Sequence, residues 1–182
     1  RGVKGKVIEV YPDTDRVIIA AFSAGHGASD VLLSRAAATN DPRLAGYLGV
    51  DAYYLDTVTS PPKPGHLAWG ELAARDGRPL WLTTSTHPNQ HRPSATACMQ
   101  PLAAALRLRP TRAPSGMPRP VRAFGRGGVR WLDYGDTFSH RDHARLLAPA
   151  ALGAWPRARA GIGAGLLLPL VPLAVLAVKL LR

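Results

Sequence analysis

The stretch Arg16-Val-Ile-Ile-Ala-Ala-Phe-Ser-Ala-Gly25 decides the fold, because it passes from strand composition to turn composition within a few residues. Its first part, Arg16–Phe22, is β-branched and apolar, which is typical of a strand buried on both faces of a parallel sheet. Small residues follow around Ser23, and Ser29–Ala38 then has helical composition. The order strand, tight turn, helix predicts the first half of a βαβ unit.

The same alternation of strand and helix continues along the chain. Three further apolar or β-branched runs predict strands at Val50–Leu55, Arg78–Thr84 and Gly128–Tyr134. Helices are predicted at His66–Arg75, near Ser94–Leu106, and from Ser139 to the residues before Pro156. Alternating strands and helices predict an α/β fold that has a mostly parallel sheet and flanking helices.

The length of 182 residues suffices for one domain with a core, which we place at residues 1–156. Lys and Arg exceed Asp and Glu by 23 to 12, a formal charge of +11, so the chain attracts polyanions such as nucleic acid or anionic lipid. The segment 107–127 is rich in Arg and Pro and predicts a positively charged loop, which is weak evidence for nucleic-acid binding. The lone Cys98 excludes an internal disulfide and a zinc site built on several cysteines.

The C-terminal part, residues 157–182, is dominated by the uncharged apolar run Ala160–Val178. As a helix, this run is long enough to cross a bilayer core of about 30 Å, and basic residues stand on both sides of it. We therefore predict an apolar helix that anchors an otherwise cytoplasmic domain to a membrane. A helix buried at an oligomer interface and a disordered or processed tail are the alternatives.

Ser23 is the candidate nucleophile. It stands in a small-x-Ser-x-Gly pattern from Ala21 to Gly25, with alanine where the first glycine of Gly-x-Ser-x-Gly usually stands. Small residues are needed on both sides, because a sharp strand-to-helix turn must push the hydroxyl into solvent. The alternative is a serine that only caps the following helix.

With this motif and the strands that follow it, the chain resembles the C-terminal half of the α/β-hydrolase fold over residues 10–156. The family order of serine, acid and histidine implies that Ser23 is the nucleophile and that the backbone N–H of Ala24 is one oxyanion donor. The resemblance places the base after the last strand, where His140 and His143 both stand. We prefer His140, because the preceding serine as N-cap puts it at the loop-to-helix junction, and keep His143 as the alternative base.

The acid of the implied triad is assigned to Asp56, which follows the predicted strand Val50–Leu55. Many members of the family carry the acid one strand later, but the loop at residues 83–90 contains no carboxylate. In the resemblance, Asp56 would orient the imidazole and stabilise its charged form. Asp133 and Asp136 are weaker substitutes.

Neither a metal nor another cofactor is expected. His87 and His91 have a four-residue spacing that would suit a metal pair. They flank Pro88, however, and no third ligand is evident in the sequence.

These residues predict a serine hydrolase that cleaves an ester or acyl substrate through an acyl-enzyme. Only fifteen residues precede Arg16, whereas the family has several strands before the nucleophile strand, so we expect an upstream segment or a second chain to complete the sheet. The missing strands and the charge of +11 also support an alternative function. In it, the chain is a non-catalytic component of a membrane complex, ribosome or virus particle that reuses a hydrolase-like half-fold.

Overall fold

The computed structural model describes residues 17–87, 92–155 and 175–179. These residues form a mixed sheet with flanking helices, which confirms the predicted α/β class. The strands are β1 (Val17–Phe22), β2 (Leu44–Val50), β3 (Leu80–Thr84), β4 (Arg109–Pro110), β5 (Arg122–Arg126), β6 (Val129–Asp133) and β7 (Val175–Lys179). Their order in the sheet is β4-β5-β6-β3-β2-β1-β7.

The centre of the sheet is parallel and its two sides are antiparallel. β1 pairs with β2, β2 with β3, and β3 with β6, all in parallel register. On one side β5 and β4 continue the sheet in antiparallel register, and on the other side β7 runs antiparallel to β1. The four parallel strands therefore end at one edge of the sheet, which is where open α/β sheets form their sites.

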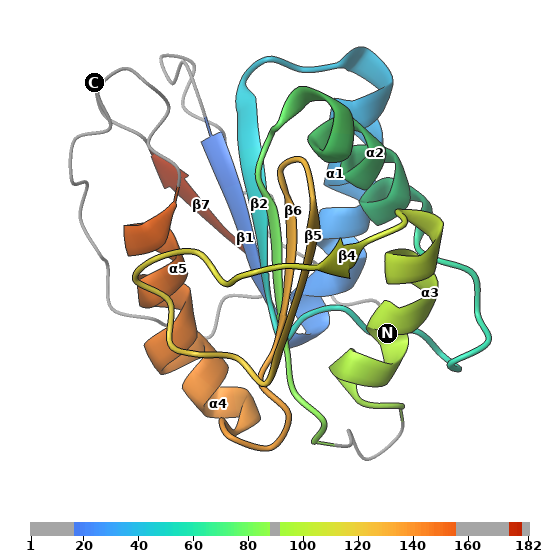
Figure 1. The fold of residues 1–182 in the computed structure, drawn as a ribbon. Helices are drawn as coiled ribbons and strands as arrows, with labels where there is room; N and C mark the ends of the chain where they lie inside the picture. The colour runs from blue at the N-terminus through green and yellow to red at the C-terminus, as the bar shows by residue number, and fades with distance from the viewer. Residues whose placement is uncertain (1–16, 88–91, 156–174, 180–182) are drawn as a thin grey trace, which may run out of the picture.

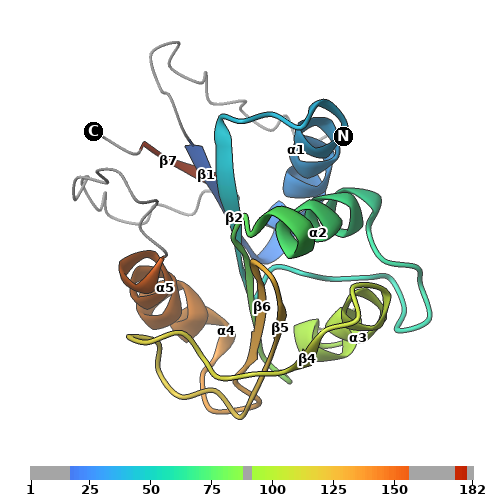
Figure 2. The same cartoon turned by 45° about the horizontal axis from the view of Figure 1, so that its top comes forward.

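Helices cover both faces of the sheet. One face packs against α1, α2 and α3, and the other packs against α4 and α5 (Figure 1, Figure 2). Short 3₁₀ and π-helical turns, η1 and η2, precede α1 and α5. The bounds are η1 (Ser23–Gly25), α1 (His26–Thr39), α2 (Pro64–Asp76), α3 (Ala95–Ala105), α4 (His140–Asp142), η2 (His143–Leu147) and α5 (Ala148–Ala154).

The core has one layer on each side of the sheet. Towards α1, α2 and α3, the largest buried side chains include Tyr47, Trp69 and Trp131. Towards α5, Trp81 of β3 packs against Trp155, with 5.0 Å between the ring centroids. Burial of apolar area on both faces accounts for the long apolar runs in the central strands.

The second strand lies earlier in the chain than predicted. β2 begins at Leu44, so the predicted strand Val50–Leu55 is wrong, and all seven residues of β2 are buried. Two glycines lower its apparent strand propensity, yet both faces of the strand are too crowded for a larger residue. A Cβ atom added at Gly46 would lie 2.5 Å from the Trp155 ring, and one at Gly49 would lie 2.5 Å from the Leu82 side chain.

The Arg- and Pro-rich segment 107–127 is not a loop throughout, because it contains β4 and β5. In β5, Arg122, Phe124 and Arg126 alternate with small residues, so these three side chains share one face of the strand. The antiparallel pairing of β5 with β6 satisfies the backbone of this polar strand. The segment was mistaken for a loop because its charge hides this alternation.

The C-terminal prediction of a helix is wrong for the part that the structure describes, because Val175–Lys179 forms β7. This strand pairs with the edge of β1 that faces away from β2, and it extends the sheet on that side. Residues 157–174, on which the choice among anchor, interface and tail depends, lie outside the described residues. Within the described ranges, every helix is too short or too polar to cross a membrane.

Candidate active site at the carboxyl ends of β1 and β2

Ser23 lies in a strained turn at the end of β1. Its φ of 53° is in the left-handed region, which a residue with a side chain adopts at a cost of about 1 kcal/mol. The extended Phe22 precedes it and α1 follows after η1. The predicted strand–turn–helix junction is therefore present, and the Ser23 side chain does not cap the helix by a hydrogen bond.

Asp51 occupies the corresponding place at the end of β2. It too has a left-handed backbone, with φ of 43°, and its side chain is 1% exposed. Oδ1 accepts a hydrogen bond from the backbone N–H of Ser85 at 2.9 Å, and Oδ2 accepts one from Ser85 Oγ at 3.0 Å. Tyr54 donates a longer bond of 3.4 Å to Oδ2. A buried carboxylate with this many donors is rigidly oriented.

His140 completes an acid–imidazole pair with Asp51. Its Nδ1–H donates to Asp51 Oδ2 over 2.6 Å, the short distance of a charge-assisted hydrogen bond. Burial alone would raise the pKa of the Asp51 carboxyl group, but the hydrogen bonds from His140 and Ser85 hold that pKa below its usual range. Asp51 is therefore an anion at neutral pH and fixes the orientation and tautomer of the imidazole.

The His140 ring also lies against the end of β1. It stacks on the ring of Phe22, with 4.4 Å between the centroids and 25° between the planes. The predicted N-cap Ser139 is part of a capping box that holds the loop in place, because Ser139 and Asp142 bind each other's backbone at the start of α4. The imidazole thus lies beside Phe22, the residue that precedes Ser23. The side chain of His140 is 40% exposed.

His26 connects Ser23 to the other side of the site. Arg92 donates to His26 Nε2 over 3.2 Å, so this nitrogen accepts, and Nδ1–H must donate to the Ser23 carbonyl oxygen at 3.1 Å. The His26 ring meets Tyr54 edge-on, with 5.7 Å between the centroids. His26 therefore holds the backbone of the strained turn through a fixed tautomer.

These contacts close into a ring around the ends of β1 and β2, which we call the contact ring. Each member contacts the next through a hydrogen bond, an aromatic pair or a peptide bond. Its members are Ser23, His26, Tyr54, Asp51, His140 and Phe22. Among the described residues, no hydrogen bond joins Ser23 Oγ to His140, and within the contact ring the two are linked through Phe22.

Asp56 is not part of the contact ring, which corrects the assignment of the acid. Its side chain is 88% exposed and lies 3.5 Å from Arg92, and it makes no hydrogen bond to His140. The error follows from the position of β2, because the strand ends at Val50 rather than at Leu55. The carboxylate that directly follows the true strand is Asp51.

The other nominated residues also have places in the structure. His143, the alternative base, is fully buried and hydrogen-bonded to Thr83 Oγ1 at 3.0 Å, so it is shielded from any substrate. Asp133 is buried and accepts from Arg122 Nε at 2.9 Å, and Asp136 is exposed. The backbone N–H of Ala24 lies in η1, at the start of the helical segment.

Metal-ligating residues do not gather in the described ranges. Among these residues, no three His, Cys, Asp or Glu side chains lie close enough to hold a metal ion. His91 lies outside the described residues, so the structure does not test the pair of His87 and His91.

Three buried histidines make stability depend on pH. Burial lowers the pKa of His26, His66 and His143, although Asp30 partly opposes this at His66. In the unfolded chain each returns to about 6.5, so unfolding takes up protons near that pH and the free energy of unfolding falls as the pH is lowered. Asp30 and Asp51, whose pKa values are held below the usual range, titrate at lower pH.

We therefore expect a lower urea midpoint at pH 5.5 than at pH 7.5. His66→Gln removes one of the three groups and should reduce the difference between the two midpoints, whatever it does to stability at pH 7.5. Equal midpoints for the unaltered protein at both pH values would contradict this linkage.

The sequence offers only a weak signal for Asp51 and Tyr54, the two site residues that it did not identify. Asp51 directly follows an apolar stretch, and Tyr54 lies three residues further on. Their shared place in the site becomes apparent only when β2 is known to end at Val50. His26 is adjacent to the serine motif, and its partner Arg92 is 66 positions away in the chain. Comparisons of the chain with models of protein families, with curated proteins and with solved structures found no match.

Proposed function

We propose that the chain is a serine hydrolase that cleaves an ester or related acyl bond, with Ser23, His140 and Asp51 as its catalytic triad. The observation that supports it most is the imidazole of His140, held at 2.6 Å by a buried carboxylate beside the strained Ser23 turn. This triad differs from the one that the α/β-hydrolase resemblance implied only in the identity of the acid. Asp51 replaces Asp56, and the chain order serine, acid, histidine is kept.

In the proposed reaction, Ser23 Oγ attacks the carbonyl carbon of the substrate while its proton passes to His140 Nε2. The protonated imidazole then gives this proton to the leaving alkoxide, and an acyl-enzyme ester remains on Ser23. Water, deprotonated by His140, hydrolyses that ester and restores the hydroxyl. Asp51 keeps the Nδ1 proton directed at itself, so that Nε2 is the nitrogen available to Ser23.

The backbone N–H of Ala24 is the proposed oxyanion donor. The first N–H groups of a helix have no acceptor within the helix, and the helix dipole favours negative charge at that end. The left-handed conformation of Ser23 begins η1 at this residue, so the amide next to the nucleophile is one of these groups. One such donor typically contributes about 100-fold to 1,000-fold to turnover.

The absence of a direct hydrogen bond between Ser23 Oγ and His140 among the described residues is compatible with this role. In enzymes without substrate, the catalytic hydrogen bonds are often long and shorten only when substrate binds. Nδ1 is fixed by Asp51 and one ring face packs on Phe22, so Nε2 is the ring nitrogen that remains for Ser23.

A fluorophosphonate probe tests the proposal, because it forms a stable bond only with an activated serine. The folded full chain should gain one probe per molecule, and peptide mapping should place it on Ser23. Ser23→Ala should abolish the labelling, whereas Ser115→Ala, a change of an exposed serine elsewhere, should leave it intact. No labelling of the folded protein, or labelling at another serine, would overturn the triad and favour a non-catalytic role.

A further inference from the structure

The chain has a long stretch that carries only positive charge. Between Gly77 and Leu132 it contains nine arginines, no lysine and no acidic residue. In the fold, most of these arginines come from the end of α3, from β4 and β5, and from the connections between them. These elements contain no residue of the contact ring.

A hollow with an aromatic wall lies among these arginines. It has a volume of about 350 Å³ and lies between the last turns of α3 and the strands β4, β5 and β6. Phe124 of β5 stacks on the buried Trp131, with 4.8 Å between the centroids and 23° between the planes. The hollow is lined by Phe124, Trp131, Leu108, Gln100, Arg107 and Arg109, together with two alanines of α3.

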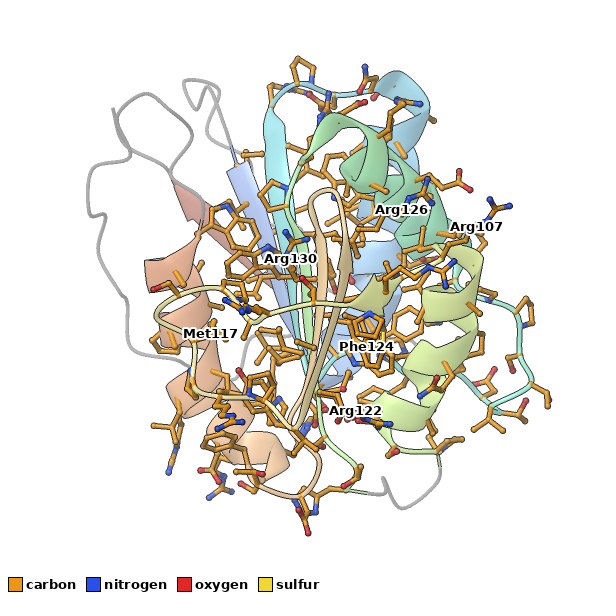
Figure 3. All side chains as sticks on the ribbon, viewed as in Figure 1. Arg107, Met117, Arg122, Phe124, Arg126 and Arg130 are labelled. Atoms are coloured by element: carbon orange, nitrogen blue, oxygen red, sulfur yellow. The ribbon has the colours of Figure 1, made fainter. Side chains whose placement is uncertain are left out.

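Positive side chains surround the aromatic wall. Figure 3 shows Phe124 between Arg122 on one side and Arg107 and Arg126 on the other. Arg122 is engaged with Asp133, and Arg126 donates to the backbone oxygen of Leu106 at the end of α3. For Arg107 and Arg109, no acidic side chain of the described residues lies within 4 Å. These two guanidinium groups at the hollow are therefore free to bind an anion.

The backbone of Arg107 is an independent observation. It has φ of 53° directly after Leu106, the C-cap residue of α3, a position at which glycine is usual. Besides Asn40, whose residue type tolerates this conformation, the other left-handed residues with a side chain in the described part of the chain are Ser23 and Asp51 of the contact ring. Backbone strain in a residue with a side chain is often found at functional positions, and Arg107 is one of the residues that line the hollow.

We propose that this surface binds single-stranded nucleic acid. One base enters the hollow and extends the stack of Trp131 and Phe124, and the neighbouring phosphates pair with Arg107 and Arg109. Aromatic side chains combined with arginine bind single strands in this way, because every base offers a face for stacking and every phosphate accepts from a guanidinium fork. Gln100 also lines the hollow, so its amide is available to hydrogen-bond the edge of the base.

The shape of the surface favours nucleic acid over a lipid membrane. A membrane surface binds proteins that project apolar side chains beyond their basic residues. Here the order is reversed, because Trp131 is buried, Phe124 is half-buried, and the arginines Arg107 and Arg109 are exposed at the rim. A ligand that fits this arrangement places a flat apolar group in the hollow and keeps its negative charge outside, beside the arginines. A nucleotide has this form, because its base is flat and its phosphate is charged.

The test is fluorescence anisotropy of a labelled 12-nucleotide oligothymidylate titrated with the full chain in about 50 mM salt. Phe124→Leu keeps the hollow apolar but removes the stacking face, and should weaken binding about tenfold. Arg109→Gln should weaken binding several-fold and make it less dependent on salt. Arg35→Gln removes the same charge from an exposed position on α1 and should change the affinity by less than twofold.

Arg107→Gly separates the binding role from folding. Glycine relieves the left-handed strain, so the variant should melt about 2–4 °C higher than the unaltered protein. It also removes a guanidinium group from the hollow, so it should bind the oligonucleotide several-fold more weakly. A variant that is more stable and yet binds less cannot be explained by loss of structure.

Three outcomes would overturn the proposal. One is the absence of oligonucleotide binding in low salt, and another is an equal loss of affinity in Arg35→Gln and Arg109→Gln, which would mean attraction by net charge alone. The third is binding to vesicles of phosphatidylserine and phosphatidylcholine without binding to the oligonucleotide. The serine-probe experiment addresses the contact ring and is independent of all three.

Discussion

Asp51→Asn is expected to lower kcat on a p-nitrophenyl ester by about 10⁴-fold, the effect of replacing the acid of a serine triad by its amide. The amide is isosteric but uncharged, so it can present an N–H to His140 Nδ1 and favour the wrong imidazole tautomer. Asparagine tolerates the left-handed backbone of position 51. The variant should therefore fold, which circular dichroism and thermal unfolding will check.

Asp56→Asn is the matched control for this prediction. The side chain of Asp56 is largely exposed and forms an ion pair with Arg92 at 3.5 Å, so the same chemical change should leave kcat within about twofold. The pair of variants distinguishes the two candidate acids directly. A large loss in Asp56→Asn together with a small loss in Asp51→Asn would contradict the geometry of the contact ring.

Gly65→Ala is expected to destabilise the protein by about 3 kcal/mol, the upper part of the range for overpacked positions. Gly65 lies in α2 where this helix meets α1, and a Cβ atom there would lie 1.9 Å from the backbone oxygen of Asp30. Backbone cannot rotate away as a side chain can, so the helices must separate. That movement would also disturb the hydrogen bonds from His66 to the Asp30 carboxylate.

Gly153→Ala is the control for this loss. Gly153 lies in α5, where an added Cβ meets no atom within 4 Å. Alanine in a helix should there increase the free energy of unfolding by about 0.5–1 kcal/mol. Urea unfolding of the two variants and the unaltered chain measures both changes, and similar midpoints for all three would show that α1 and α2 pack less closely than described.

The first βα unit could be predicted because its signals are local. The β-branched run of β1 and the small residues around Ser23 each act through their nearest neighbours in the chain. The capping box at Ser139 and Asp142 is likewise a pattern of four residues, and the structure contains it. The position of His140 at the start of α4 follows from that pattern.

The acid could not be predicted, because its position depends on packing between distant segments. β2 keeps glycines where Trp155 and Leu82 approach, and these glycines made a later, aromatic stretch look like the better strand. That error moved the expected end of the strand from Val50 to Leu55. Asp51 then fell inside the expected strand rather than after it.

The contacts of Arg92 show a second kind of limit. Its two partners, His26 and Asp56, are separated by thirty positions from each other and by more from Arg92 itself. Nothing in the local sequence of any of them indicates the others. The same holds for β7, whose apolar residues are compatible with a helix until the pairing with β1 is known.

The pairing of β7 with β1 has a consequence for self-association. Without β7, the backbone of Val17–Phe22 would be an open sheet edge of apolar residues, a template on which another chain could add a strand. With β7 in place, both edges of β1 are occupied and such strand exchange must first break the pairing. Retention of Val175–Lys179 therefore guards the strand that leads to Ser23 against aggregation, in addition to widening the sheet.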